Sequence, residues 1–558
     1  MKIDNKKLKE LLVKESYIAE EVVEEALARA ERTATPLTTV LIERGILTND
    51  LLGQAIAEYY GVPYADMNSN PPTAEQVNLL PEEFARRNRA VVYEKEEGKP
   101  VIVAATEPDD PKLLEELTRI LKTDGVKLIY ALPDEVEAAF VHYRKPLETR
   151  FRQIAARGGR LAAELFDYIL ADAALLKASD VHIEPHEQET LVRFRVDGVL
   201  HDAGRIPREY HENIVNRIKV LSRLRTDEHK AVQDGAVRVA TDGKVIEARV
   251  SIAPIYDGEK VVMRILAYYV RGFTLHDLGF FEEHRRTVEE AAKSPFGMIL
   301  AAGPTGSGKT TTLYAVTKLL NSPGINITTI EDPVEYKIEG VNHIQVNPAV
   351  GLTFAQGLKS IVRQDPDIIL VGEIRDSETA SIAVNAALTG HLLLSTLHAN
   401  DAATAIPRLL EMGVEPFLIA STVEIIVAQR LVRKICESCR MSYVVTKQEL
   451  GRLVPGAQAY FGNTATHTLF KGRGCAVCQQ SGYSGRTGIF EILPASTELR
   501  ELILKKPSIS EIYALEGRQK VRSLFDDGIE KVKAGITTIE EVKRVAEPRG
   551  RALGARFA

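Results

Sequence analysis

The residues of this chain with the clearest chemical meaning are 303–310, which spell GPTGSGKT. They fit the spacing G-x-x-x-x-G-K-[ST], follow the apolar residues 298–300 and precede a helical pattern over 311–320. Glycines let backbone N–H groups surround a phosphate, and the N-terminus of the next helix adds partial positive charge. A chance Gly-rich turn is the alternative, but both flanks argue against it. The segment predicts a nucleoside triphosphate site.

Two side chains of this loop have separate expected roles. Lys309 is expected to reach the β- and γ-phosphates, and the Thr310 hydroxyl is expected to hold Mg²⁺. We therefore expect ATP and Mg²⁺ at this loop. The residues expected to contact the nucleotide are Gly303, Pro304, Thr305, Gly306, Ser307, Gly308, Lys309, Thr310 and Thr311.

Three later apolar segments end in side chains that can do acid–base chemistry. Glu331 follows ITTI, Glu373 follows IILVG, and His398 follows LLLSTL. Ligands of parallel sheets bind at the carboxyl ends of the strands, so we expect all three near the phosphates. A carboxylate there can orient or deprotonate the attacking water, and a polar group on the last strand can sense the γ-phosphate. Each residue alone has an ordinary structural explanation, but together they favour a shared active site.

The four cysteines form two C-x-x-C pairs, Cys436 with Cys439 and Cys475 with Cys478. Four thiolates suit tetrahedral Zn²⁺ and leave no coordination position open, so we expect a structural zinc site. Buried free cysteines or a redox pair are the alternatives.

The composition narrows the class of protein. The chain has 558 residues, of which 45% are hydrophobic and 27% charged, as in soluble proteins of several domains. Its net charge of −6 argues against a chain-wide nucleic-acid surface. No apolar run approaches the ~20 residues of a membrane span, and the charged N-terminus lacks a signal-peptide core. We expect a cytoplasmic protein whose membrane role, if it has one, is peripheral.

Hydrophobic periodicity predicts helices over 1–66, arranged as a weak internal repeat, and a small α/β subdomain over 67–143. An Arg-rich linker is expected over 144–160, and a mixed α+β domain over 161–275. Residues 280–500 alternate strands with helices, which predicts a mostly parallel, helix-covered sheet with a cysteine-bearing insertion over 436–478. Residues 501–546 are expected to be helical and 547–558 to be a disordered tail. The strands predicted before residue 280 are 101–105, 126–130, 181–183, 191–196, 245–252 and 261–266, with hairpin turns at Asp197-Gly198 and Asp242-Gly243.

Taken in order, these segments resemble the secretion/pilus traffic ATPase family. The matching segments are 303–310, 330–335, 363–376 and 390–398, which that family calls the Walker A, Asp, Walker B and His boxes. Residues 179–185, 193–198 and 258–264 resemble the family's PAS-like second N-terminal domain. The resemblance covers about residues 1–546 and is densest over 160–500.

The resemblance implies an α/β fold with a RecA-like P-loop core, a PAS-like domain and a hexameric ring. It implies that Glu331 is the better candidate for the base and that Glu373 is the Mg²⁺-side acid. It also implies that Arg249 and Arg264 reach the phosphates as arginine-finger analogues, which suits planar and always charged donors. The alternative is that both arginines are ordinary residues on a strand surface.

The resemblance further implies a function. The expected protein is a cytoplasmic hexameric ATPase that polymerises pilin for type IV pilus assembly through an inner-membrane platform protein, at the inner face of the membrane. The four-cysteine insertion is typical of the pilus-assembly and type II secretion branches, so a type II secretion ATPase that extends a pseudopilus is the alternative. A nucleic-acid motor and a nucleotide-sensing scaffold are rivals. We expect no nucleic-acid partner.

The N-terminal repeat resembles the cyclic-di-GMP-binding N-domain of the family, whose motif begins Arg-Leu-Gly. The two copies here read Lys7-Leu8-Lys9 and Pro36-Leu37-Thr38. The motif's arginine and glycine are absent from both copies. These substitutions argue against binding of cyclic-di-GMP and favour a helical docking module.

Overall fold

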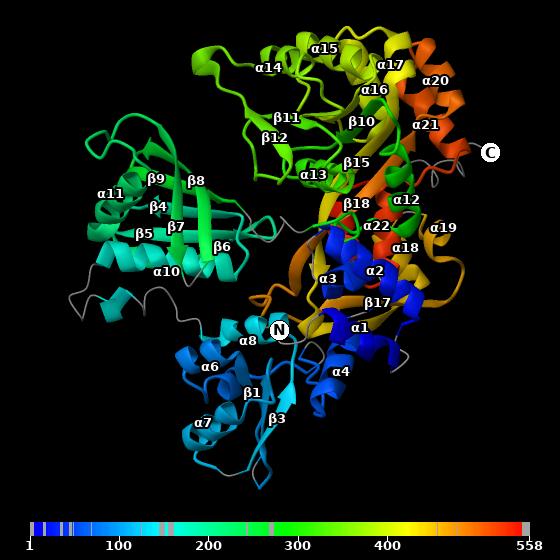
Figure 1. Cartoon of the computed structure of the whole chain (residues 1–558). Coiled ribbons are helices and arrows are strands. Elements are labelled where there is room, and N and C mark those ends of the chain that lie inside the picture. The colour runs from blue at the N-terminus through cyan, green and yellow to red at the C-terminus, as the bar shows by residue number, and fades with distance from the viewer. Residues whose placement is uncertain are drawn as a thin grey trace. The chain divides into compact units, whose positions relative to one another are not determined.

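The computed structural model of the chain (Figure 1) describes most of its residues. The described ranges are 5–14, 18–33, 37–43, 47, 49–67, 70–96, 98–123, 125–143, 151–154, 161–241, 244–266, 273–454, 456–475 and 477–548. The predicted turn at Asp242-Gly243, most of the predicted linker and residues 549–558 of the predicted tail lie outside them. None of the helices in the described ranges combines the length and the apolar composition that a membrane span requires.

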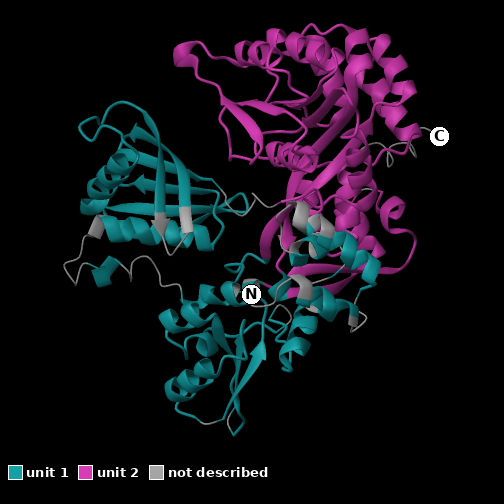
Figure 2. Cartoon of the chain, viewed as in Figure 1, with its two compact units in different colours: residues 1–268, 437–439, 474–482 teal, residues 269–436, 440–473, 483–558 magenta. Residues whose placement is uncertain are grey.

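The chain divides into two compact units (Figure 2). Unit 1 consists of residues 1–268 with the short segments 437–439 and 474–482, and unit 2 consists of 269–436, 440–473 and 483–558.

Unit 1 begins with the predicted helices, which bury their apolar faces in one cluster that includes Leu12, Val23 and Leu41. A three-stranded sheet follows, in the order β1-β2-β3, with β1 antiparallel to β2 and β2 parallel to β3. The predicted strands at 101–105 and 126–130 are confirmed, whereas β1 was not predicted. The elements are α1 (Asn5–Lys14), α2 (Glu20–Thr33), α3 (Leu37–Glu43), α4 (Asn49–Tyr60), α5 (Ala74–Val77), α6 (Glu82–Asn88), β1 (Ala90–Glu94), β2 (Val101–Ala105), α7 (Pro111–Leu121), β3 (Val126–Tyr130) and α8 (Pro133–Ala139).

The rest of unit 1 is built on an antiparallel six-stranded sheet, in the order β6-β5-β4-β9-β8-β7. One face packs against two helices and forms an apolar core, which also includes Ile154 from the region predicted as a linker. The strands are β4 (Asp180–Pro185), β5 (Glu189–Val196), β6 (Val199–Pro207), β7 (Gln233–Thr241), β8 (Lys244–Ile255) and β9 (Gly258–Ile265), and the helices are α10 (Leu161–Leu175) and α11 (His211–Leu221). Strands β6 and β7 and helix α11 were not predicted from the sequence. Asp197 and Gly198 both have positive φ, as the predicted tight turn between β5 and β6 requires.

Unit 2 contains a seven-stranded sheet, in the order β12-β11-β13-β14-β10-β15-β18. Neighbouring strands are parallel except for β15 and β18. The strands are β10 (Gly297–Ala302), β11 (Ile327–Glu331), β12 (Val341–Gln345), β13 (Ile368–Val371), β14 (Leu392–Leu397), β15 (Val423–Ile435) and β18 (Tyr483–Pro494). The predicted α/β sheet with mostly parallel strands is therefore confirmed.

Helices cover both faces of this sheet (Figure 1). Alternate residues of β10 enter two different apolar clusters. Leu300 belongs to the cluster that contains residues of α14 to α17, α20 and α21, whereas Ile299 belongs to the cluster that contains residues of α12 and α13. The helices are α12 (Glu282–Ala291), α13 (Lys309–Leu320), α14 (Phe354–Ile361), α15 (Ser377–Leu388), α16 (Ala402–Glu411), α17 (Pro416–Thr422), α20 (Thr497–Leu504), α21 (Ile509–Arg518), α22 (Leu524–Lys533) and α23 (Ile539–Val545).

An antiparallel hairpin with two short helices lies between the cysteine pairs in the sequence, and its apolar side chains pack on α22 and α23. Its elements are β16 (Arg440–Thr446), α18 (Lys447–Leu453), α19 (Ala457–Phe461) and β17 (Thr466–Gly472).

Candidate active site and metal cluster

The predicted phosphate loop joins β10 to α13, which begins at Lys309. The loop glycines Gly303, Gly306 and Gly308 have φ of 152°, 77° and 89°. Residues other than glycine are strained at these positive φ values. The predicted strand–loop–helix arrangement is therefore confirmed. It places the loop's backbone N–H groups at the N-terminus of a buried helix.

Lys309 lies over this loop. Its Nζ donates hydrogen bonds to Gly303 O at 2.8 Å and to Pro304 O at 3.0 Å. The pKa of Lys309 lies below its usual value because of burial, and the charge of Glu373 opposes this effect. Ser307 Oγ is buried and has no hydrogen-bond partner in the described part of the chain. The loop thus holds a cation and a spare hydroxyl, both of which phosphate oxygens could satisfy.

Glu331, at the end of β11, is 2% exposed and lies in a dense hydrogen-bond network. Tyr314 donates to its Oε2 at 2.5 Å, and Thr329 donates to its Oε1 at 2.6 Å. His343 Nδ1 lies 3.0 Å from the same Oε1. Burial and the neighbouring carboxylate raise the pKa of Tyr314, so this phenol remains a donor.

The tautomer of His343 follows from its other contact. The backbone N–H of Ile338 donates to His343 Nε2 at 3.1 Å, so Nε2 is an acceptor and the proton of the neutral ring lies on Nδ1. Nδ1 is therefore a donor, and both Glu331 Oε1 and Thr329 Oγ1 lie 3.0 Å from it. With three side-chain donors and 2% exposure, the Glu331 carboxylate has little capacity left for a water molecule.

Glu373 has a different environment. It follows β13, and its side chain contacts Arg375 at 2.5 Å and His398 Nε2 at 3.2 Å. Both partners are well exposed, at 62% and 45% of their side chains. The predicted proximity of Glu373 and His398 is therefore present.

The glycine between β13 and Glu373 has a packing role. A Cβ at Gly372 would lie 3.3 Å from both Ile330 O and Glu331 Cα, and the Gly372 N–H donates to Ile330 O at 2.7 Å. Thr396 on β14 donates to Gly372 O at 2.8 Å. A glycine here lets the ends of β11, β13 and β14 approach one another.

Arg249 and Arg264 lie directly opposite each other on β8 and β9. The register continues the row through Asp180 on β4 to Arg195 on β5. Residues of the apolar core or packed against it flank Arg249, Arg264 and Arg195 on both sides in sequence, and Val181 of the core follows Asp180, so the row lies on the outer face of the six-stranded sheet. Asp180 is 6% exposed and accepts hydrogen bonds from Arg264 Nε at 3.1 Å and from Ser179 at 2.8 Å.

A second buried carboxylate, Glu184, lies four residues further along β4 and points to the same face of the sheet. Arg193 and Lys260 contact it at 2.6 and 2.8 Å. Burial raises the pKa of Glu184, but the hydrogen bonds from these two cations lower it to about 2. This outer face therefore carries cations above two buried carboxylates.

The four cysteine sulfurs lie within 4.8 Å of one another, and three of the four residues are buried. Sγ of Cys478 lies 3.8 Å from that of Cys439 and 3.6 Å from that of Cys475. Tetrahedral Zn–S bonds of ~2.3 Å place sulfurs roughly 3.8 Å apart, so this cluster has the dimensions of a four-thiolate metal site. The backbone N–H groups of Cys475 and Gly482 donate to Cys478 Sγ at 3.2 and 3.3 Å, which favours a thiolate there.

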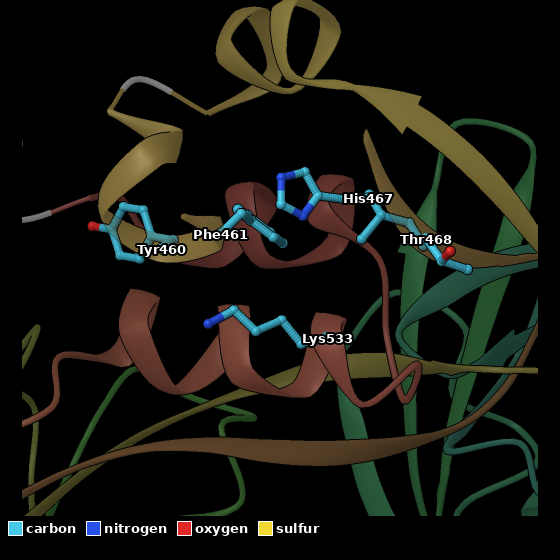
Figure 3. Close-up of a pocket in the computed structure, with 6 residues that line it drawn as sticks. Tyr460, Phe461, His467, Thr468 and Lys533 are labelled. Atoms are coloured by element: carbon cyan, nitrogen blue, oxygen red, sulfur yellow. The ribbon is translucent and has the colours of Figure 1, made fainter. Parts of the chain in front are cut away.

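Several residues of these sites were not predicted from the sequence, among them Tyr314, His343 and Asp180. Another is Gln429, whose side chain donates a hydrogen bond to Ser307 O in the phosphate loop. Gln429 was detectable in principle, because it is a polar residue within the apolar run of β15. A small pocket between α19, β17 and α22 is shown in Figure 3. Its described lining includes no predicted site residue and consists of Tyr460, Phe461, His467, Thr468, Leu469 and Lys533.

Comparison with known proteins agrees with this geometry. The Type II/IV secretion system protein family matches residues 156–544, and the MshEN domain matches residues 60–150. The type IV pilus assembly ATPase PilB of Myxococcus xanthus is 35% identical over 559 residues, covering 96% of this chain and 98% of that protein. Type II secretion system protein E of Dickeya dadantii is 41% identical over 501 residues, covering 85% and 98%.

Among solved structures, the ATPase DotB of Legionella pneumophila gives a TM-score of 0.50 at 21% identity, covering 68% of this chain and 94% of that one. That likeness concerns the fold alone. The sequence matches extend over most of the chain and include the phosphate loop and the strand ends described above. The chain therefore belongs to the Type II/IV secretion system protein family and is one of its ATPases.

Proposed function

We propose that this ATPase powers the polymerisation of pilin subunits for type IV pilus assembly. The observation that carries the proposal is the near full-length match to a pilus assembly ATPase, which includes the N-terminal region. The higher identity to a type II secretion protein, over a smaller share of this chain, favours pseudopilus extension as the second candidate.

The phosphate loop is proposed to bind ATP, with Lys309 leaving its two carbonyl partners for the β- and γ-phosphates. Thr310 and Glu373 would hold Mg²⁺, which supplies charge neutralisation for phosphoryl transfer. The three side-chain partners and the burial of Glu331 support a positioning role. The more open contacts of Glu373 and His398 support a role beside the attacking water. Glu331 as the base stays a prediction that mutation has to test.

The six-stranded sheet is proposed to be the PAS-like domain, and the seven-stranded sheet to be the RecA-like core. Arg249 and Arg264 would then approach the phosphates from the outer face of the six-stranded sheet. Support comes from their adjacent positions and from the buried carboxylate of Asp180, which holds Arg264. Transfer of a phosphoryl group spreads negative charge that such guanidinium groups stabilise.

We propose that six chains form a ring that acts on an inner-membrane platform protein from the cytoplasmic side. A motor needs each site to report to the next, and head-to-tail contacts provide this when the rotation closes. The ATPase rate per chain should then rise with protein concentration as rings assemble. A preparation that light scattering shows to be monomeric, yet that works at the full rate, would contradict the ring.

The cysteine cluster is proposed to bind one Zn²⁺ and to stabilise the insertion that, by family resemblance, faces the platform protein. The N-terminal repeat is proposed to be a docking module without a cyclic-di-GMP site, although an MshEN domain matches residues 60–150. Lys9, where the motif has glycine, forms ion pairs with Glu20 and Glu24 of α2. Calorimetry that detected cyclic-di-GMP binding would overturn this second proposal.

The pathway can be tested in a strain that lacks the chain, complemented with the wild type or with Lys309→Ala. Loss of surface pili that only the wild type restores supports pilus assembly. Intact pili with lost protein secretion would transfer the function to the type II pathway. If DNA stimulates ATP hydrolysis by the purified chain, that result would favour the nucleic-acid motor.

A further inference from the structure

Gln429 lies on β15 beside the phosphate loop and is 2% exposed. The register pairs Ala428 with Ala302, the last residue of β10, so Gln429 lies where the loop begins. Its Nε2 donates to Ser307 O at 2.6 Å, and its Oε1 accepts from Thr312 Oγ1 at 2.7 Å. One amide therefore ties the loop and the first turn of α13 to a neighbouring strand.

The bond to Ser307 O sets the direction of a peptide unit. In a trans peptide the C=O and the following N–H point in opposite directions. Because Ser307 O points to Gln429, the N–H of Gly308 points away from it. Backbone N–H groups of this loop are the groups that surround a phosphate, so their orientation before binding decides how much reorganisation binding requires.

The glycines of the loop are adapted to the same strand. A Cβ at Gly308 would lie 2.9 Å from Gln429 Nε2, and a Cβ at Gly303 would lie 2.7 Å from Gln429 O. A larger residue at either position would push the loop off β15. Three residues with positive φ also make the free loop costly to order, which a fixed amide partner reduces.

We propose that Gln429 is a positioning residue that preorganises the phosphate loop for nucleotide. It contacts the loop and not the reacting atoms. This inference rests on the proposed role of the loop as the ATP site, and it adds a residue from a strand that carries none of the predicted nucleotide-binding or catalytic side chains.

The test uses the full chain with Gln429→Met, which keeps much of the volume and removes both hydrogen bonds. The expected result is about tenfold weaker binding of a non-hydrolysable ATP analogue, with a lower kcat, at a temperature well below melting. Amide hydrogen exchange of residues 303–312 without nucleotide should be faster than in the wild type.

Thr312→Val removes only the hydrogen bond to Gln429 Oε1, and Thr317→Val is its matched control. Thr317 is fully buried on the same helix, but its hydroxyl donates to Leu313 O within that helix. Thr317→Val should leave nucleotide affinity unchanged. The double variant Gln429→Met/Thr312→Val should lose less affinity than the sum of the single changes, because both remove the same bond.

Wild-type affinity and kcat in Gln429→Met would overturn the inference. A lower melting temperature with unchanged affinity and exchange would also overturn it, since that result describes a purely structural residue. Lys309→Ala separates the inference about Gln429 from the assignment of the ATP site. If Lys309→Ala is inactive while Gln429→Met is normal, only the inference fails, and if both are fully active, the assignment of the ATP site fails.

Discussion

Glu331 lies at the carboxyl edge of the seven-stranded sheet, where it is 2% exposed and surrounded by three side-chain donors. Arg264 lies on the outer face of the six-stranded sheet, where its side chain is 65% exposed and is held by the buried Asp180. Groups of the first region satisfy one another before nucleotide binds. Cations of the second region keep hydrogen-bonding capacity for a further anion. Removing a group from the first region should leave buried partners unsatisfied, while removing an arginine should cost chemistry more than stability.

The largest effect is expected for Lys309→Ala. Lys309 is the side-chain cation that the loop itself supplies, so we expect ATP turnover to be abolished. Its partners are two backbone carbonyls of the loop, one of them at the exposed Pro304, and we expect the melting temperature to stay near that of the wild type. Lys359→Ala is the control, because Lys359 is an exposed lysine of unit 2 that pairs with Glu378. Near-normal turnover in Lys309→Ala would refute the assignment of the loop.

Arg249→Ala and Arg264→Ala test the second region. Arginine fingers contribute ~10³–10⁵-fold to kcat, so we expect losses within that range with nucleotide binding retained. Arg205→Ala is the control, since Arg205 is an exposed arginine of the same sheet that pairs with Glu189. If both the turnover and the binding of the two variants match the wild type, the arginines are ordinary residues of a strand surface.

Glu373→Gln and Glu331→Gln separate the two carboxylates. A group that orients or deprotonates the attacking water contributes ~10²–10⁴-fold, and we expect Glu373→Gln to lose kcat on this scale with unchanged melting. Glu331→Gln would also lower kcat, but it should lower the melting temperature as well, because an amide cannot accept from all three donors. Tyr314→Phe removes one donor and is the matched probe of that network. If Glu331→Gln folds normally and is inactive while Glu373→Gln is active, Glu331 is the base.

The sequence predicted those parts of the site that lie close together along the chain. The phosphate loop, the strand ends at Glu331 and Glu373 and the cysteine pairs are short patterns, and the structure has them in the expected places. The partners of these residues could not be predicted in the same way. Ser307 and Gln429 are 122 positions apart, and their contact exists only because β15 pairs with β10.

The secondary structure shows the same limit. Strands with clear apolar runs, such as β10 and β14, were predicted, whereas β6, with Gly204 and several polar residues, was not. Strand β7 begins with Gln233, Asp234 and Gly235, of which aspartate and glycine are depleted in strands, and its pairing with β8 determines its conformation. Tertiary context outweighed local propensity in these elements.

The smallest effect on turnover is expected from removal of the metal. We expect one Zn²⁺ per chain in freshly purified protein by elemental analysis, and a protein without metal would count strongly against the assignment. Chelation should speed hydrogen exchange within residues 436–478. Cys436 lies seven residues beyond Gln429 in the sequence, or roughly 23 Å along an extended strand, so turnover of the isolated chain should change little.

A buried ion pair lies between Gln429 and Cys436 along β15, and it should limit how far the loosening caused by chelation spreads. Arg433 on β15 donates from its backbone and its guanidinium to Glu541, at 3.0 and 2.6 Å. Burial raises the pKa of Glu541, but the hydrogen bonds from Arg433 and Arg544 lower it to about 2, so the carboxylate is ionised at neutral pH. After chelation, exchange in residues 430–435 should stay slow in the wild type and become faster in Glu541→Gln. Equal loosening of these residues in both proteins would show that Glu541 does not isolate the phosphate loop from the metal cluster.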